Sequence, residues 1–214
     1  MSEVEKQNTL IQAKPRIRPS SNSFQIAPLT DKVIQDVAKI HRMVLPQTFS
    51  SRLGQHFVES QYQILLRDTH ARGWIATQAT SVVGVITATL DLHATEHFLK
   101  SKISYNQKAR ALLRVLTNSY DFVAFVSHCR MTQYCRRFGR PYPILLTLGV
   151  IPGTMPTIAY KLMDAAHTFY KESGLSEYFL DTLADNQRAQ EFYRLLGFEK
   201  QGRIAGNLIL RRKI

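Results

Sequence analysis

Residues 178–200 read YFLDTLADNQRAQEFYRLLGFEK, and this stretch decides the fold. It begins as an apolar run typical of a strand, turns at the polar pair Asp185-Asn186 and continues with apolar residues at helical spacing. Asn186 is suited to cap a helix, because its side chain can accept a hydrogen bond from a free backbone N–H group. Gly197 is suited to end that helix, because glycine adopts the left-handed conformation without a Cβ clash. The stretch therefore predicts a strand, a turn and a helix, after which Phe198 returns to the core.

The rest of the chain divides into strands and helices by the same signals. Pro156 suits the first turn of a helix, and apolar residues recur at helical spacing from Ile158 until Gly174 ends the pattern. The predicted elements are, in order, a strand at 23–29, a helix capped by Thr30 and reaching about Met43, a helix from Ser51, a hairpin at 73–78 and 81–91, a largely helical insertion at about 92–141, a strand at 143–150, the helix after Pro156, the strand and helix described above, and a closing hairpin at 198–204 and 207–214. We expect residues 24–214 to form one domain, preceded by a flexible arm at residues 1–23.

Length and composition limit the class of protein. A chain of 214 residues with 44% hydrophobic content can bury one real core. It has only two cysteines, Cys129 and Cys135, and no apolar leader follows Met1, so we expect a cytoplasmic protein without disulfides. No apolar run approaches the ~20 residues that a membrane-spanning helix needs.

The charge of the chain predicts an acidic partner. The 28 basic residues outnumber the 16 acidic ones, which gives a net charge of +12. Between Leu92 and Arg140, nine Lys and Arg residues face only Glu96 and Asp121, so over half of the excess lies in one segment. Such a balance suits nucleic acid, anionic lipid, a phosphorylated cofactor or an acidic carrier protein, and charge alone does not choose among them.

The decisive stretch resembles a known family. The spacing of seven residues is similar to the N-x-x-A-x-x-F-Y-x-x-x-G-F signature of the GNAT superfamily of N-acetyltransferases; they are Asn186, Ala189, Phe192, Tyr193, Leu196, Gly197 and Phe198. The resemblance extends weakly over residues 24–91 and well over 142–204. It implies an α/β fold with a mixed, mostly antiparallel central sheet flanked by helices. It also implies an acyl-CoA-dependent N-acyltransferase, in the first place an N-acetyltransferase, in which a primary amine attacks acetyl-CoA directly in a ternary complex.

The resemblance assigns roles to particular residues. In the family two parallel strands splay apart, and the pantetheine arm of the donor fills the gap as an extra strand would. Here those strands are residues 143–150 and 177–183, with the backbone of Leu148, Gly149 and Val150 against the donor. Asn186 and Phe192 belong to the same cofactor-binding set. Tyr193 is the general acid: a phenol with a pKa of about 10 is protonated at neutral pH and can give its proton to a departing thiolate.

The chain departs from the family at the pyrophosphate loop. The family pattern Q/R-x-x-G-x-G/A is absent, because Met155, Ile158 and Tyr160 take its three defining positions. Residues 153–157 are expected to form a looser phosphate site; they are Gly153, Thr154, Met155, Pro156 and Thr157. Three hypotheses follow: an acyl-CoA donor with a remodelled loop, a donor tethered to an acyl carrier protein as in GNAT-like acyl-homoserine lactone synthases, and a non-catalytic basic binding module.

The acceptor side is weakly marked. Six residues are candidate bases for the amine, but none has a diagnostic spacing and the reading as an ordinary surface or core residue is preferred for each; they are His56, Glu59, Asp91, His93, Glu96 and His97. A weak similarity of residues 41–62 to a GNAT subgroup suggests an amino sugar as the small-molecule amine.

Other ligands have less support. His128, Cys129 and Cys135 lack the spacing of a zinc site, so no metal is expected. The aromatic and basic residues 120–140 carry no nucleic-acid motif, and peripheral membrane contact stays an alternative there. The sequence leaves a homodimer open.

Overall fold

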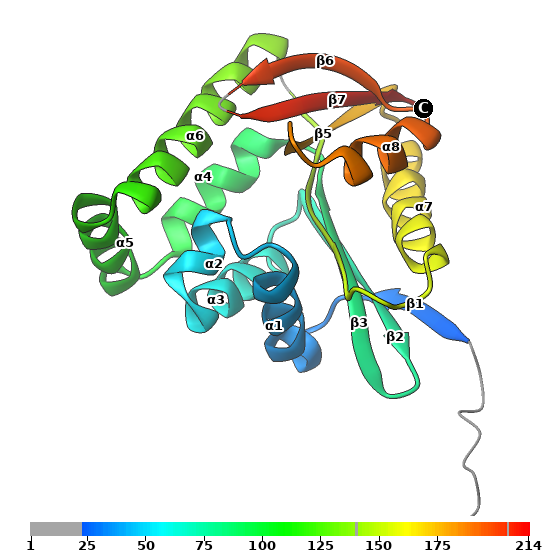
Figure 1. The fold of residues 1–214 in the computed structure, drawn as a ribbon, viewed down its shortest axis with the longest axis horizontal. Coiled ribbons are helices and arrows are strands. Elements are labelled where there is room, and N and C mark those ends of the chain that lie inside the picture. Colours follow the sequence, from blue (N-terminus) through cyan, green and yellow to red (C-terminus); the bar gives the residue numbers. More distant parts are fainter. Residues whose placement is uncertain (1–22, 140, 205) are drawn as a thin grey trace, which may run out of the picture.

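A seven-stranded sheet forms the centre of the computed structural model, which describes residues 23–139, 141–204 and 206–214 (Figure 1). The arm predicted at residues 1–23 therefore lies, except for Ser23, outside the described residues. The strands are β1 (Phe24–Pro28), β2 (Ala71–Gln78), β3 (Ser81–Thr89), β4 (Ile144–Val150), β5 (Glu177–Leu183), β6 (Glu199–Ile204) and β7 (Asn207–Lys213). Their order is β1-β2-β3-β4-β5-β7-β6, and only the pair β4 and β5 is parallel. This confirms the predicted mixed, mostly antiparallel sheet.

Helices cover both faces of the sheet. They are α1 (Ile34–Val44), α2 (Phe49–Leu53), α3 (Gln55–Leu65), α4 (Leu92–Lys102), α5 (Tyr105–Thr117), α6 (Ser119–Cys135), α7 (Thr157–Glu172) and α8 (Gln187–Leu195). One core cluster lies under α7 and α8, a second under α1 and α3, and a third between β5 and the helices α4 and α6. In Figure 1 the last two groups of helices lie on the opposite side of the sheet from α7 and α8.

Two helix boundaries differ from the prediction. Thr30 makes no side-chain cap, and a 3-10 turn at Asp31–Val33 precedes α1. The single helix predicted from Ser51 is two helices, because Gly54 between them has a φ of +101° that α-helical geometry excludes. The insertion is helical as predicted and consists of α4, α5, α6 and a 3-10 turn at Arg136–Phe138.

Candidate functional site

The parallel strands β4 and β5 separate almost at once after they meet. Their one residue pair is Ile144 with Phe179, and the Phe179 N–H donates to the carbonyl of Pro143 at 2.9 Å. Against β3, strand β4 carries an extra residue: Thr147 faces Thr87 and Leu145 faces Ala88, so Leu146 forms a β-bulge. A bulge bends its strand. It lies where β4 leaves β5, and the backbone of residues 147–150 has no strand partner on that side.

The residues that follow the bulge are incompletely covered. Leu146, Thr147 and Leu148 are half-buried although β4 is a central strand with helices on both faces, and Asp181 and Leu183 of β5 are exposed. This unpaired and incompletely covered region between β4 and β5 is the opening.

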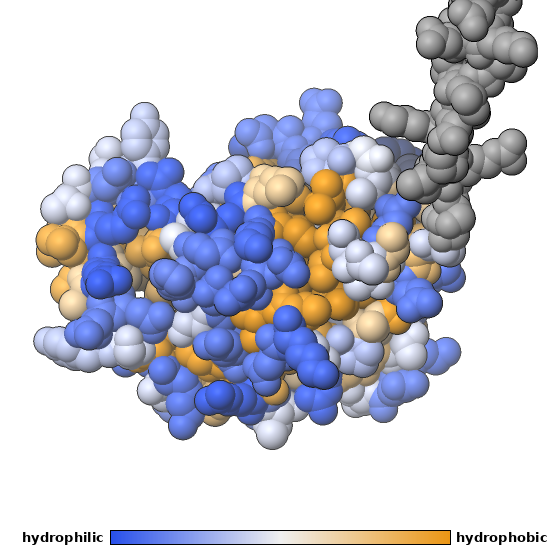
Figure 2. Space-filling view, turned by 90° about the horizontal axis from the view of Figure 1, so that it is seen from below, coloured by the Kyte–Doolittle hydropathy of each residue, from blue (hydrophilic) through white to orange (hydrophobic). Residues whose placement is uncertain are grey.

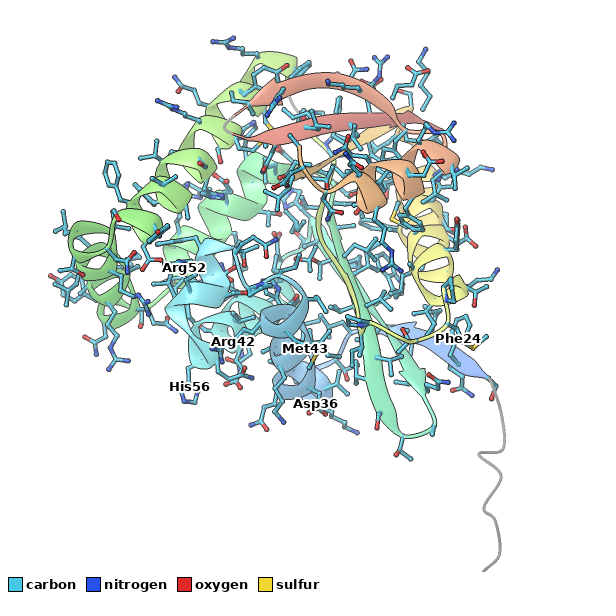
Figure 3. The ribbon with its side chains drawn as sticks, viewed as in Figure 1. Phe24, Asp36, Arg42, Met43, Arg52 and His56 are labelled. Atoms are coloured by element: carbon cyan, nitrogen blue, oxygen red, sulfur yellow. The ribbon has the colours of Figure 1, made fainter. Side chains whose placement is uncertain are left out.

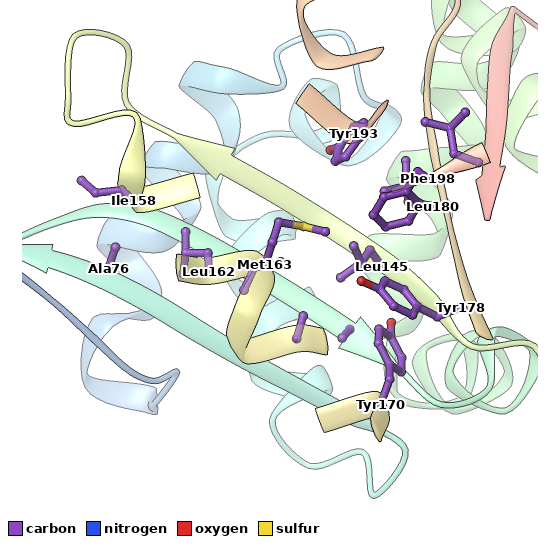
Figure 4. Packing of buried hydrophobic residues seen from close by; sticks show 14 of the residues in the cluster. Ala76, Leu145, Ile158, Leu162, Met163, Tyr170, Tyr178, Leu180, Tyr193 and Phe198 are labelled. Atoms are coloured by element: carbon purple, nitrogen blue, oxygen red, sulfur yellow. The ribbon is translucent and has the colours of Figure 1, made fainter. Parts of the chain in front are cut away.

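Tyr193 of α8 lies beside this opening. Its side chain is 9% exposed and packs in the same core cluster as Leu145 and Leu180 (Figure 4). Burial raises the pKa of its hydroxyl, the carboxylate of Asp181 raises it further, and no hydrogen bond opposes the shift. The hydroxyl is thus a proton donor that keeps its proton at neutral pH.

Asn186 performs the predicted capping role. Its side-chain oxygen accepts a hydrogen bond from the N–H of Ala189 at 3.0 Å, which fixes the start of α8. Gly197 ends the helix region with a φ of +81°, and Phe198 is buried as expected. The amide nitrogen of Asn186 keeps its two N–H donors for a ligand.

The loop between β4 and α7 is held by its own residues. The Thr154 hydroxyl donates to the carbonyl of Ile151 at 2.7 Å, and Gly153 has a φ of +84°. Pro156 caps α7 without a side-chain bond, Thr157 is the first helical residue, and Met155 packs against the core cluster under α7.

The family's two small positions are filled in different ways. Ile158 is completely buried in the core, so it does not narrow the approach to the loop from outside. Tyr160 instead lies edge-on to Phe192 of α8, with ring centroids 4.9 Å apart. The side chain at the Gly/Ala position therefore occupies space between α7 and α8, and Phe192 takes part in this contact.

Two of the six candidate bases lie on α3. His56 is 97% exposed, points away from the sheet (Figure 3) and lies 3.2 Å from Glu59, with which it can form an ion pair. His56 therefore faces solvent rather than the opening between β4 and β5.

The other four candidates gather around α4. Asp91 caps α4 by accepting from the His93 N–H at 2.9 Å. Burial opposes ionisation of Glu96, but hydrogen bonds from His128, Thr132 and Lys100 hold its pKa down at about 2. His93 and His97 line a cavity of about 450 Å³.

These four residues lie near the start of β4, whereas β4 and β5 diverge toward the end of β4. The N–H of Leu92, the first residue of α4, donates to the carbonyl of Tyr142 at 2.9 Å. Tyr142 precedes β4, where β4 and β5 are still paired. The structure thus keeps Asp91, His93 and His97 away from the place where the strands diverge. Glu96 is linked to it, because His128 lies 3.3 Å from Glu96 and close enough to Asp181 for its charge to oppose the burial that raises the pKa of that carboxylate.

A carboxylate that sequence reasoning missed does lie at the opening. Asp181 is exposed, yet the surrounding protein desolvates its carboxylate and raises its pKa, while a 2.7 Å hydrogen bond from Asn207 opposes the shift. Exposure combined with desolvation is typical of a concave surface, where protein surrounds a group that water still reaches. The sequence signal was a charged residue within the apolar strand EYFLDTL.

A buried hydrogen-bonded group supports β4 from the other face. His41 Nδ1 lies 2.9 Å from the Tyr62 hydroxyl, and burial lowers the pKa of His41 to about 4. Burial raises the pKa of Tyr62, and a hydrogen bond with the Thr147 side chain partly offsets this. His41 is therefore neutral at neutral pH and belongs to the support of the bulge.

Neither a metal-ligand cluster nor a membrane-crossing helix occurs in the part of the chain that the structure describes. No three His, Cys, Asp or Glu side chains in it come together as a metal site would require. None of its helices combines the length and the apolar character that crossing a membrane demands.

Comparisons with known proteins agree with this arrangement. The family model described as "Acetyltransferase (GNAT) family" matches residues 157–198, which run from the start of α7 to Phe198. No curated protein matches the chain.

Solved structures share the fold at low sequence identity. An N-acetyltransferase from Thermoplasma acidophilum in complex with coenzyme A has a TM-score of 0.55 and 16% identity, covering 90% of this chain and 99% of its own. The ribosomal-protein-S18-alanine N-acetyltransferase from Escherichia coli has a TM-score of 0.55 and 13% identity, with 90% and 94% covered. An aminoglycoside antibiotic 6'-N-acetyltransferase from Acinetobacter baumannii has a TM-score of 0.56 and 14% identity, with 85% and 94% covered. These likenesses establish the fold.

Proposed function

We propose that this chain transfers an acyl group from acyl-CoA to a primary amine. Its resemblance to the GNAT superfamily and its GNAT-type fold, both confirmed, support this proposal. Acetyl is the first acyl group to test. The observation that carries the proposal is the early separation of β4 from β5 beside the buried hydroxyl of Tyr193. A non-catalytic fold has no need of an open central strand with a proton donor next to it.

The donor would bind as a missing strand. Backbone groups of Leu148, Gly149 and Val150 lie on the unpaired side of β4 and can hydrogen-bond the pantetheine amides. The same backbone N–H groups would polarise the thioester carbonyl and stabilise the oxyanion that forms on attack. Asn186 supports the pantetheine end through its free amide N–H groups.

Two side chains would move the protons. Attack by the neutral amine forms the C–N bond and breaks the C–S bond, and Tyr193 gives its proton to the departing sulfur. Asp181 takes up the proton that the amine nitrogen loses and passes it to solvent, and Tyr193 regains a proton from solvent before the next turnover. The raised pKa of Asp181 supports this role, because it makes the carboxylate a stronger base than an ordinary aspartate. Both groups flank the opening, and the charge of one is felt at the other.

The acceptor would be a small amine that reaches the opening from the side of α1, α2 and α6. The aminoglycoside acetyltransferase among the structural relatives supports an amino sugar, which carries several primary amines. An exposed carboxylate at Asp181 also suits a cationic acceptor.

A second donor is supported by one contact. Tyr160 fills part of the space between α7 and α8, where the family has Gly or Ala, and this reduces the room for a pyrophosphate. A thioester carried on the phosphopantetheine arm of an acyl carrier protein avoids the need for a full nucleotide site.

The test is release of free thiol from four donors in the presence of a panel of primary amines. Acetyl-CoA, acetylpantetheine and an acetylated carrier protein are compared, with longer acyl-CoA as the fourth. Calorimetric titration with acetyl-CoA and free CoA is run in parallel. Amine-dependent release from any donor supports the proposal, and the ratio between acetyl-CoA and acetylpantetheine measures the pyrophosphate contribution. Absence of release from all four, with every amine, overturns it in favour of a binding module.

A further inference from the structure

The helical hairpin formed by α5 and α6 exposes a concentration of large apolar side chains. Eight of them are between 40% and 84% exposed; they are Tyr105, Leu112, Leu113, Leu116, Tyr120, Phe122, Val123 and Phe125. No residue of α5 is buried. Exposed apolar residues normally occur singly, so a cluster of this size on two adjacent helices indicates a contact surface.

The hairpin is folded by local bonds and does not need to bury that surface. Ser104 and Gln107 form a capping box at the start of α5. The side-chain oxygen of Asn118 accepts from the N–H groups of Tyr120 and Asp121 at 3.0 and 3.2 Å, which starts α6. Local caps of this kind let α5 form while its apolar residues stay uncovered.

The hairpin is fixed to the body in one orientation. Asp121 has no exposed side-chain area, and it pairs with Arg52 of α2 and with Arg114 of α5, the latter at 3.1 Å. Burial opposes its ionisation, but the two guanidinium groups hold the pKa of Asp121 below its usual value. Figure 3 shows Arg52 at the side of α2 that faces the hairpin. The rings of Phe49 in α2 and Phe125 in α6 are also in contact, with their centroids 5.9 Å apart. The apolar residues other than Phe125 are therefore presented outward by a fixed support.

The charge around this surface has one sign. Between Leu92 and Phe138 the only acidic residues are Glu96 and Asp121, and both are buried and paired. Exposed basic residues lie on the same hairpin, on the neighbouring α4 and in the 3-10 turn after α6; they are Lys100, Lys102, Lys108, Arg110, Arg114, Arg130 and Arg137. Seen from below, several apolar side chains lie at the left end of the molecule among hydrophilic ones (Figure 2). The outer surface of the hairpin is thus apolar and cationic, without an exposed carboxylate.

We propose that this hairpin docks the protein on an anionic lipid surface. Its apolar side chains enter the interface between headgroups and acyl chains, and its basic residues contact the phosphates. Long Lys and Arg side chains and Tyr rings suit this position, because each joins an apolar stem to a polar end.

Charge and position disfavour the other occupants. A second copy would bring two positive surfaces together without a carboxylate to neutralise them. An acidic carrier protein has the complementary charge, but under the proposed function it must deliver its arm between α7 and α8. Those helices lie at the opposite end of the molecule from α5 (Figure 1).

Vesicle co-sedimentation of the full chain tests the proposal directly and does not depend on acyl transfer. Mixed phosphatidylglycerol/phosphatidylcholine vesicles are compared with pure phosphatidylcholine. We expect the wild-type chain to bind the mixed vesicles and to lose about tenfold in affinity on pure phosphatidylcholine. Leu112→Glu combined with Leu116→Glu should lower the affinity by about tenfold or more, and so should Lys108→Glu combined with Arg110→Glu.

Matched controls carry the same chemistry elsewhere. Met43 is 58% exposed and Lys39 64% exposed, both on α1, so Met43→Glu and Lys39→Glu should bind like the wild type. Circular dichroism and thermal unfolding establish that the α5 variants fold, which is expected because α5 has no buried residue.

Three results would overturn the proposal. One is a wild-type chain that does not bind the anionic vesicles. Another is a Leu112/Leu116 variant that binds them as well as the wild type. The third is a dimer in light scattering that the same variant converts to a monomer, since a second copy would then cover the surface.

Discussion

Replacement of Tyr193 by Phe removes one oxygen atom from the candidate site and leaves its packing in place. The ring is 9% exposed and contacts Phe192 and Phe198, with centroids 5.3 and 5.6 Å away. Only burial and the charge of Asp181 shift the pKa of the hydroxyl, and no hydrogen bond contributes. Its removal therefore loses little stabilising interaction, and we expect the free energy of unfolding to change by less than about 1 kcal/mol.

The effect on turnover should be much larger. General acid catalysis contributes roughly 10²–10⁴ in rate, and the lower end applies because a thiolate is already a fair leaving group. A fall of about 10² in kcat corresponds to about 2.7 kcal/mol of lost transition-state stabilisation. The KM for the donor should stay nearly constant, since the ring that shapes the site is still present.

The assay is steady-state thiol release with the best donor and amine from the panel, at saturating donor. Tyr170→Phe is the matched control, because Tyr170 is also buried in the cluster under α7 but lies away from Tyr193 (Figure 4). Its turnover should equal that of the wild type. If Tyr193→Phe retains kcat within about threefold of the wild type in an active preparation, the hydroxyl is not the general acid and the reasoning from its burial is refuted.

Three further predictions concern the carboxylate, the β4 backbone and the buried imidazole. Asp181→Asn should lower kcat/KM by about 10² at neutral pH. The difference from the wild type should shrink as the pH rises, because more of the amine is then already neutral in solution. A difference in kcat/KM that does not depend on pH would contradict a role for Asp181 as base. Gly149→Ala places a Cβ 2.6 Å from Cγ2 of Val44, so we expect urea unfolding to show a loss of about 1–3 kcal/mol that Val44→Ala partly restores; full stability of the single variant would contradict the contact. Burial lowers the pKa of His41 from 6.5 to about 4, so the unfolded chain binds a proton more readily than the folded chain. The free energy of unfolding should therefore be highest above pH 6.5 and fall by about 3 kcal/mol as the pH decreases toward 4. His41→Asn should flatten that part of the stability profile, and an unchanged profile would assign the pH dependence to another group.

The sequence predicted the elements whose signals are local and left out those that depend on the assembled fold. Asn186 and Gly197 mark the two ends of α8 by their own chemistry, and the alternation of strands and helices predicted the sheet. The bulge at Leu146 had no local signal, because it arises from the register of β4 against β3. Asp181 was overlooked since its environment is made by segments far away in the chain. Gly54 is a different case. A glycine inside an expected helix is itself a sequence signal for a break, and the positive φ of Gly54 in the structure accounts for that break.

The altered phosphate loop and the opening between β4 and β5 are expected to affect different kinetic constants, the KM for the donor and kcat respectively. Contacts to a pyrophosphate lie far from the reacting thioester, so they are equally strong before and during acyl transfer, and they lower the KM without raising kcat. Under the proposed function the backbone beyond Leu146 and the hydroxyl of Tyr193 would act on the bonds that form and break, so they would determine kcat. A chain with Tyr160 at the Gly/Ala position can therefore lose donor affinity and keep its turnover rate. Weak donor binding is accordingly no argument against catalysis, and the substitution at Tyr193, read at saturating donor, is what distinguishes an acyltransferase from a binding module.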